Sequence, residues 1–307
     1  MSTSLTSPGL IFAANKALIG AHRAIAKVSQ FATDFSADAA QPGDTMAVEF
    51  FDTDPATDYD DDSNNYGTVN GTVKDVKVTF DKRVKKTYGY KPTDLLKASA
   101  AIWTRKGDAA GIAVGLAIEQ KVAALINKTN IPKTGDGYGS YNEVVVASVT
   151  KKALSNLRAA CAAVGDAGID PARTVLVLTP AAFADALALF DANVYGGSEA
   201  IRNGVLPGLY GFKGVMELNL SKTAGENLVG ALVPAEALGI AGRTIPADEF
   251  DGAECGFTTD EASGLTLSTY AFVDKNTRTH KFTIEALFGA KLIQPGKCVR
   301  LVSEATA

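Results

Sequence analysis

Acidic side chains gather in one short polar segment, and carboxylates are well suited to hold a hard metal ion. The segment contains Asp58, Asp60, Asp61, Asp62 and Asn64. Oxygen ligands crowded in a loop can bind Ca²⁺. The spacing does not fit a calcium loop, because counting from Asp60 puts Asn65 at the turn glycine and Gly71 at the bidentate glutamate. We therefore favour a solvated hairpin tip and predict no metal site.

The sequence shows no recognisable catalytic motif elsewhere. Neither of its two histidines, His22 and His280, lies at metal-ligand spacing from a cysteine. It contains neither a Gly-x-Ser-x-Gly elbow nor a phosphate loop ending in Gly-Lys-Ser/Thr. Glycines 135, 137 and 139 have the wrong spacing for a dinucleotide fingerprint and follow a predicted helix, so we interpret them as a loop. We predict no catalytic residue and no cofactor, which favours a structural or binding role.

One small basic cluster and three aromatic residues could contact nucleic acid. The cluster contains Lys82, Arg83, Lys85 and Lys86, and the aromatic residues are Tyr88, Tyr90 and Trp103. For the cluster we favour a charged exposed edge or an inter-subunit partner for the acidic tip. For the aromatic residues, near a strand end and a helix start, we favour packing in a core or an interface.

Composition limits the classes of protein further. The chain has 307 residues, 46% hydrophobic residues and a formal net charge of −4, which predicts a folded protein and argues against a dedicated nucleic-acid reader. The three cysteines, Cys161, Cys255 and Cys298, are far apart, as expected in a reducing cytoplasm; Cys161 is interpreted as buried. The longest apolar run, 111–118, is too short to span a bilayer. We expect no signal peptide and no membrane partner.

The order of predicted elements begins with extended and helical segments. We expect a terminal arm at 1–44, with an amphipathic helix over about 13–31 that packs on a neighbouring subunit. A projecting β-hairpin follows at 45–90, with its polar tip at 52–65. Residues 91–140 should hold a long helix that begins near Pro92, pauses at 106–108 and ends after Ile126, with Ile112, Leu116, Ala123 and Ile126 on one face.

The second half is predicted to be α/β and then strand-rich. Residues 141–262 should form a compact region with a helix at 151–164, a buried strand at 174–178, a helix from Pro180 to Phe190, and strands at 215–220 and 228–233. Residues 263–307 should form long strands at 265–273 and 281–293 around a turn at 274–277, and a last strand at 297–302. The fold class is therefore α+β.

This order resembles the Hong Kong 97-like coat proteins of tailed double-stranded DNA bacteriophages, whose fold is shared with herpesvirus shells and bacterial encapsulins. Local sequences add to the likeness over nearly the whole chain. They are Val175-Leu-Val-Leu-Thr-Pro-Ala-Ala-Phe183, the glycine-rich stretch 199–215, and Phe282-Thr-Ile-Glu-Ala-Leu-Phe-Gly-Ala-Lys-Leu-Ile-Gln-Pro-Gly-Lys-Cys298. In family terms the five segments would be the N-terminal arm, the extended loop, the peripheral domain with its spine helix, the axial domain, and the closing strands of the peripheral domain.

The resemblance implies a major capsid protein that self-assembles into hexamers and pentamers of an icosahedral shell in the host cytoplasm. The shell would enclose DNA without sequence-specific binding, and portal, scaffolding and decoration proteins would be further partners. An encapsulin-like compartment, an unrecognised α/β enzyme and a tail or decoration component remain alternatives. Some family members form a covalent cross-link from a Lys to an Asn with help from a Glu. Glu285 falls near that Glu, but Arg278 takes the place of the Asn, so we expect Glu285 to be structural and boiled, reduced particles to run as monomers.

Overall fold

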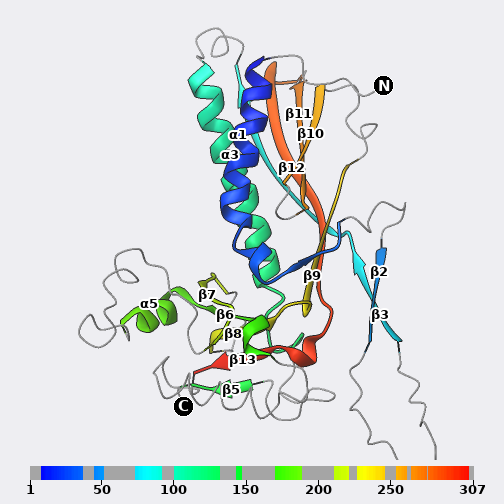
Figure 1. Ribbon diagram of the computed structural model, residues 1–307. Helices are drawn as coiled ribbons and strands as arrows, with labels where there is room; N and C mark the ends of the chain where they lie inside the picture. Colours follow the sequence, from blue (N-terminus) through cyan, green and yellow to red (C-terminus); the bar gives the residue numbers. More distant parts are fainter. Residues whose placement is uncertain are drawn as a thin grey trace, which may run out of the picture.

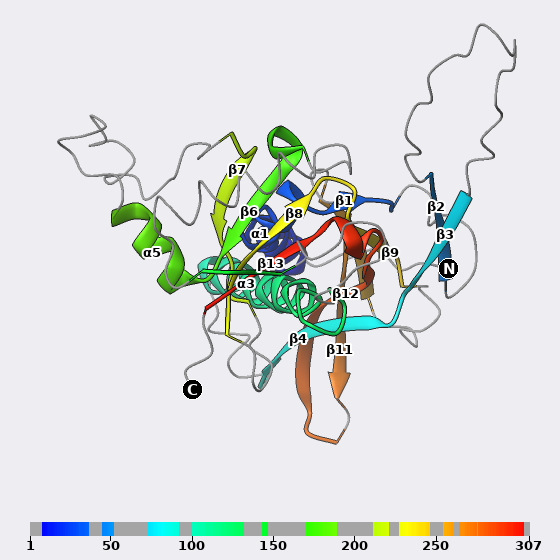
Figure 2. The ribbon, with the colours of Figure 1, turned by 90° about the horizontal axis from the view of Figure 1, so that it is seen from below.

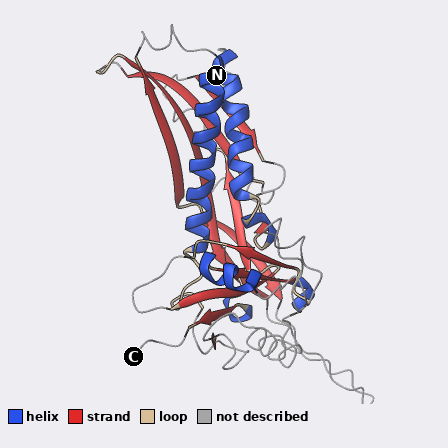
Figure 3. Ribbon diagram, turned by 90° about the vertical axis from the view of Figure 1, so that its left-hand side faces the viewer, coloured by secondary structure: helices blue, strands red, loops and turns tan. Residues whose placement is uncertain are grey.

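The computed structural model describes residues 8–36, 45–51, 73–91, 100–131, 143–146, 170–188, 211–220, 227–245, 254–260, 264–274 and 276–303. Within them, two long helices lie side by side on one face of a long sheet (Figures 1 and 3). A second sheet lies at one end of this layer, and a two-stranded hairpin lies beside the sheet near that end (Figures 1 and 2). The α+β class predicted from the sequence is confirmed.

The long sheet is organised around one 14-residue strand, β12 (Thr279–Leu292), which is about 46 Å long at 3.3 Å per residue. One edge of β12 pairs antiparallel with β11 (Thr266–Asp274), which pairs with β10 (Glu254–Thr259). Its other edge pairs first with β4 (Lys82–Tyr90) and then with β9 (Leu238–Arg243). A short strand, β1 (Thr33–Asp34), continues the sheet in parallel with β9. We predicted β11 and β12, but β1, β9 and β10 were missed.

Alternation along β12 separates the two faces of the sheet. Phe282, Ile284, Ala286 and Phe288 belong to the main hydrophobic core beneath the helices, as a half-buried strand requires. The intervening positions Thr283 and Glu285 are also buried, although they point to the opposite face. The central strand therefore has an apolar face toward the helices and a buried polar row on its other face.

The two helices are α1 (Pro8–Ile25) and α3 (Ala100–Ala123). The predicted start of the long helix at Pro92 lies outside the described residues, and the predicted pause at 106–108 is wrong, because α3 continues through it. The predicted face was also partly wrong: Leu116 is exposed. The buried face instead carries Ala110, Val114, Ile118 and Val122, with Ala123 and Ile126 buried as expected.

The close approach of α1 and α3 explains why α3 continues through Gly107 without a break. A Cβ atom at Gly107 would lie 2.3 Å from the carbonyl oxygen of Ala13, and one at Gly111 would lie 1.9 Å from that of Ala17. Gly20 of α1 makes the reciprocal approach to the backbone of Asp108. The helix backbones therefore lie too close for side chains at these points, and the glycines serve helix packing.

The same contact overturns our expectation that the N-terminal helix packs on a neighbouring subunit. Ala13, Ala17, Ala21 and Ile25 of α1 are buried in the core of their own chain. A short 3₁₀ turn, Val28–Gln30, follows α1, so the helix also ends earlier than the predicted 13–31 segment. The helix is amphipathic as predicted, but the surface that covers its apolar side belongs to α3 and the long sheet.

The second sheet has the strand order β5-β13-β8-β6-β7. The strands are β5 (Glu143–Val145), β6 (Thr174–Leu178), β7 (Gly214–Glu217), β8 (Leu228–Pro234) and β13 (Val299–Val302). Every residue of β6 is buried, because Val175 and Val177 join the main core while Leu176 and Leu178 join a second core with Phe183. Phe183 belongs to α5 (Pro180–Ala188), a helix whose start at Pro180 was predicted. The predicted helix at 151–164 lies outside the described residues.

The hairpin consists of β2 (Thr45–Phe51) and β3 (Val73–Thr79), in register from Thr45 opposite Thr79 to Phe51 opposite Val73. Its tip, 52–72, lies outside the described residues. Met46, Val48 and Val78 pack against Ala241 and Ile293, so the base of the hairpin rests on the body of its own chain. Residues 82–90, which we expected within the hairpin, instead form β4 in the long sheet.

Candidate interaction surface on the long sheet

The predicted basic cluster lies on β4, at an edge of the long sheet. One edge of β4 pairs with β12, and no other described strand pairs with β4. Lys85 and Lys86 are exposed, Arg83 is half-exposed, and Lys82 is largely covered. The sequence therefore located a charged exposed edge correctly, since lysines are common on strand edges that face solvent.

A fully buried carboxylate fixes part of this cluster. The side chain of Glu285 on β12 is 0% exposed and forms an ion pair with Nε of Arg83, whose side chain is 49% exposed. Its other oxygen, Oε2, accepts a hydrogen bond of 3.1 Å from the hydroxyl of Tyr270. Ser268, directly opposite Glu285 on β11, is buried, and its hydroxyl has no hydrogen-bond partner among the described residues. Glu285 thus holds the guanidinium of Arg83 at the surface of the sheet.

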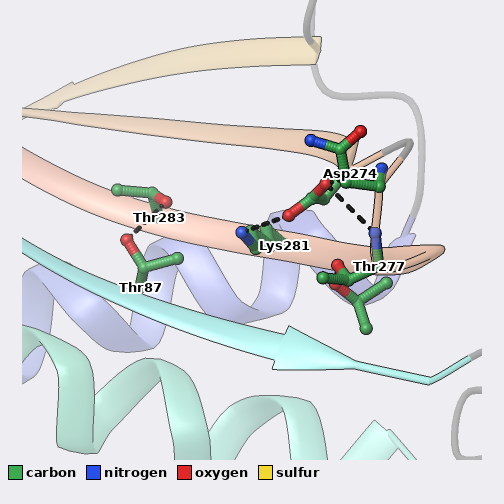
Figure 4. A network of polar contacts seen from close by, with 7 residues as sticks. Thr87, Asp274, Thr277, Lys281 and Thr283 are labelled. Carbon is green, nitrogen blue, oxygen red and sulfur yellow. Dashed lines mark hydrogen bonds and ion pairs between the residues drawn. The ribbon is translucent and has the colours of Figure 1, made fainter.

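A second polar group lies at the far end of the sheet, around the β11–β12 turn (Figure 4). Oδ2 of Asp274 accepts a bond of 2.6 Å from Lys281, and its Oδ1 accepts from the backbone N–H groups of Asn276 and Thr277. These bonds, with Lys281 first, lower the pKa of Asp274 to about 2. The predicted turn at 274–277 is therefore a carboxylate-capped turn, which keeps Asp274 ionised over the physiological range.

The face opposite the helices combines this turn with aromatic rings. Tyr270 and Phe272 stack with ring centroids 6.0 Å apart, and the ammonium of Lys281 lies 5.9 Å from the Phe272 ring centre. The Thr87 and Thr283 hydroxyls hydrogen-bond across β4 and β12 at 2.9 Å (Figure 4). Such a surface offers hydroxyl groups, fixed charges and ring faces to a partner.

The histidines do not come together. Nδ1 of His22 lies 2.6 Å from Oδ1 of Asp260, which links α1 to the end of β10, whereas His280 is exposed near the β11–β12 turn. Within the described residues, no three His, Cys, Asp or Glu side chains lie close enough together to hold a metal ion. None of the described helices is long and apolar enough to cross a membrane. The His22–Asp260 pair is best explained as a link between elements.

Two buried ionisable groups lie away from this surface. Burial raises the pKa of the Cys298 thiol to about 12, and Cys255 is buried as well. Glu119, on the buried side of α3, has its pKa raised mainly by desolvation, with opposing effects from nearby Lys27 and Glu217. The carboxyl group of Glu119 therefore holds its proton to higher pH than an exposed glutamate does.

Several predicted features lie outside the described residues. They are the acidic segment 58–64, the glycines at 135–139, Cys161, and the side chains of Trp103 and Tyr90. Tyr88 is described, and the ammonium groups of Lys86 and Lys106 lie 5.7 and 6.0 Å from its ring centre. Sequence reasoning missed the pairing of Glu285 with Arg83 and with Tyr270. Two features of the sequence pointed to Glu285: it is a charged residue within an apolar strand, and the family resemblance singles it out.

Comparison with known proteins gives matches in structure but none in sequence. No protein-family model matches the chain, and no curated protein does. Among solved structures, the capsid of the cyanophage P-SCSP1u is similar with a TM-score of 0.59 and 13% identity, over 90% of this chain and 87% of that one. The capsid of a native GTA particle gives a TM-score of 0.59 and 15% identity, over 91% and 90%.

The chain has the Hong Kong 97-like capsid fold. A virus-like particle from Pyrococcus furiosus is similar over still more of both chains, 94% of this one and 97% of that one, with a TM-score of 0.51 and 15% identity. The correspondence thus includes the helix pair, the long sheet and the second sheet together, rather than one common motif. The fold predicted from the order of the sequence elements is confirmed.

Proposed function

We propose that this chain is a shell-forming structural subunit, the major capsid protein of an icosahedral particle that encloses a double-stranded DNA genome. The observation that supports this best is the extent of the likeness to capsids, about nine tenths of both chains in the cyanophage and GTA structures. In this proposal the chain is not an enzyme. It assembles with itself into hexamers and pentamers, and portal, scaffolding and decoration proteins are candidate partners.

The five segments then have distinct parts in assembly. Residues 1–44 are an arm only in part, since α1 packs in its own core. The hairpin within 45–90 lies across a neighbouring subunit, and residues 141–262 meet around the axes of hexamers and pentamers. The peripheral segments 91–140 and 263–307 provide the rigid body. Each contact between subunits can be weak, because a closed symmetric shell makes many of them at once.

A second shell function has a specific observation in its favour. The Pyrococcus furiosus virus-like particle is similar over 94% of this chain and 97% of its own. An encapsulin-like compartment would hold protein cargo rather than a genome. Particles purified from infected or expressing cells and treated with nuclease would separate the two: protected DNA supports the capsid, and DNA-free particles with a co-purifying protein support the compartment.

Deletion of residues 52–66 tests the shell function through the hairpin tip. The base of the hairpin packs on the body of the chain through Met46, Val48 and Val78, so the shortened chain should fold. We expect its circular dichroism spectrum and melting temperature to match the wild type, and its yield of sedimenting particles to fall sharply. A wild-type yield of shells from the deletion variant would contradict the assembly role of the hairpin.

A further inference from the structure

We propose that the solvent side of the helix pair α1 and α3 binds the phosphate backbone of the double-stranded DNA that the shell encloses. This inference rests on the proposed capsid function, and it names the face of the subunit that meets the genome. The contacts are three exposed basic side chains, Lys16 of α1, Lys27 just beyond it, and Arg105 of α3. Phosphate contacts of this kind carry no base sequence information.

The charges that the described side chains of the helix pair expose are all positive, although the chain as a whole carries a formal net charge of −4. The sequence of α1 contains no acidic residue, and that of α3 contains only Asp108 and Glu119. Asp108 is half-buried beside Gly20 of α1, and Glu119 is buried. Burial also raises the pKa of Glu119, which favours its neutral form. A surface with exposed charges of one sign attracts a polyanion.

The register of the two helices spaces these basic residues along their common axis. Gly107 of α3 lies against Ala13 of α1, and the next close contact is one turn further along both helices, so the helices run parallel and in step. Lys16 is therefore five residues beyond the level of Arg105, about 7.5 Å at 1.5 Å per residue. Lys27 is eleven residues further, about 16 Å. The three charges span roughly 24 Å, or about two thirds of a turn of DNA.

These cations are available to a ligand. Among the described residues, no carboxylate forms an ion pair with Lys16, Lys27 or Arg105. A fourth exposed cation lies near the lower end of the row, where Nζ of Lys213 donates a hydrogen bond of 3.4 Å to the carbonyl oxygen of Gln30. The side of the helix pair turned away from the long sheet carries no other described element (Figures 1 and 3). A long, straight ligand can therefore lie along the helices.

A partner protein is the alternative occupant, because Ile19 and Leu116 are exposed on the same helices, by 43% and 46%. A helix that docks on an apolar face usually has anchors at the spacing i, i+3, i+4 and i+7, and it needs a matching apolar groove. Exposed hydrophobic residues that occur singly are common on protein surfaces. The unpaired positive charges therefore favour DNA, and the two explanations require different side chains.

Charge removal tests the contact. The helix variant carries Lys16→Gln, Lys27→Gln and Arg105→Gln, and dissociated subunits are titrated into a fluorescent DNA duplex while anisotropy is measured at several salt concentrations. Each lost phosphate contact lowers the slope of log K against log salt by about 0.9, so we expect the slope to fall by about 2.7 and the affinity at 0.1 M salt by on the order of a hundredfold. The matched control, Lys77→Gln with Lys85→Gln and Lys291→Gln, removes three exposed charges from the hairpin and sheet and should keep the wild-type slope.

Cysteine labelling shows whether this face is turned inward in a shell. Chains carrying Lys16→Cys are treated with a maleimide joined to a polymer too large to pass through the shell. We expect the dissociated subunit to react and the closed particle to be protected. The described native cysteines, Cys255 and Cys298, are buried, and the wild-type chain is treated in the same way as a blank.

The outcomes separate this contact from the proposed function. Closed particles that react at position 16, or a helix variant that binds DNA like the wild type, would overturn the contact and leave the shell function standing. DNA binding that survives the loss of the three charges but is lost in Ile19→Ser with Leu116→Ser would overturn it in favour of an apolar ligand. Charge-dependent DNA binding by a chain that never forms closed particles would support the contact and overturn the shell function.

Discussion

Replacing Gly111 by alanine should destabilise the subunit, although alanine is the better helix former. In an open helix the change would stabilise by about 1 kcal/mol. Here the new Cβ would lie 1.9 Å from the carbonyl oxygen of Ala17 and 2.7 Å from its Cα. Backbone atoms cannot rotate away as a flexible side chain can. The two helices must therefore separate by more than an ångström, at the point where both backbones are buried.

The size of the effect follows from two opposing terms. Overpacking a tight core costs typically 1–3 kcal/mol, and a backbone obstacle, which cannot rotate away, places this site at about 3 kcal/mol, the upper end of that range. After the gain of about 1 kcal/mol in helix propensity, we expect a net loss of about 2 kcal/mol in the free energy of unfolding. For a chain of this size that is a fall of roughly 3 °C in melting temperature.

Urea denaturation of the dissociated subunit, followed by circular dichroism, measures the loss. Gly89→Ala is the control, because a Cβ there meets nothing within 4 Å, and we expect a change within about 0.5 kcal/mol. A Gly111→Ala subunit that is as stable as the wild type, or more stable, would refute the close helix contact.

Three further predictions concern buried groups. Arg83→Gln should lower the free energy of unfolding by about 3 kcal/mol, because it leaves the buried Glu285 carboxylate without its cation. Glu285→Gln should cost less, since the half-exposed Arg83 can be hydrated. Equal losses for the two variants in urea denaturation would contradict this. The pKa of the Cys298 thiol is about 12 in the folded chain and near 8.5 in the unfolded chain. The stability of the wild type relative to Cys298→Ala should therefore fall by about 1.4 kcal/mol per pH unit above roughly pH 9. A stability difference between the two chains that stays constant from pH 8 to 10.5 would show that the thiol is not buried. Burial raises the pKa of Glu119, so the folded state binds more protons than the unfolded state. Stability is therefore lost as the pH rises from the pKa of the unfolded state through the pKa of the folded state. Glu119→Gln should remove that loss and be more stable than the wild type at pH 7 but not at pH 4, as measured by thermal unfolding at both pH values.

The parts of the fold that the sequence predicted well are those in which one physical signal dominates. β6 is a continuous apolar run, and it is buried on both faces as such runs are. The β11–β12 pair was predicted from strands on both sides of a polar turn, and Asp274 does cap that turn. The order of such elements along the chain was enough to predict the α+β fold.

The errors arise where tertiary contact outweighs the local signal. Gly107 favours a helix break by its propensity, but the backbone of Ala13 requires a glycine there. β9 has two glycines in six residues, an unusual strand composition, and a Cβ at Gly239 or Gly242 would be crowded by neighbouring segments. The pairing of Arg83 with Glu285 joins residues 202 positions apart, and nothing in either local sequence predicts which partner each will find.

Negative-stain electron microscopy of the purified wild-type chain, expressed alone and together with candidate scaffolding proteins, shows whether this chain builds shells. We expect closed shells of uniform diameter, or the hexamer and pentamer rings from which such shells are built. A homogeneous monomer under every condition, or open tubes instead of closed shells, would contradict it.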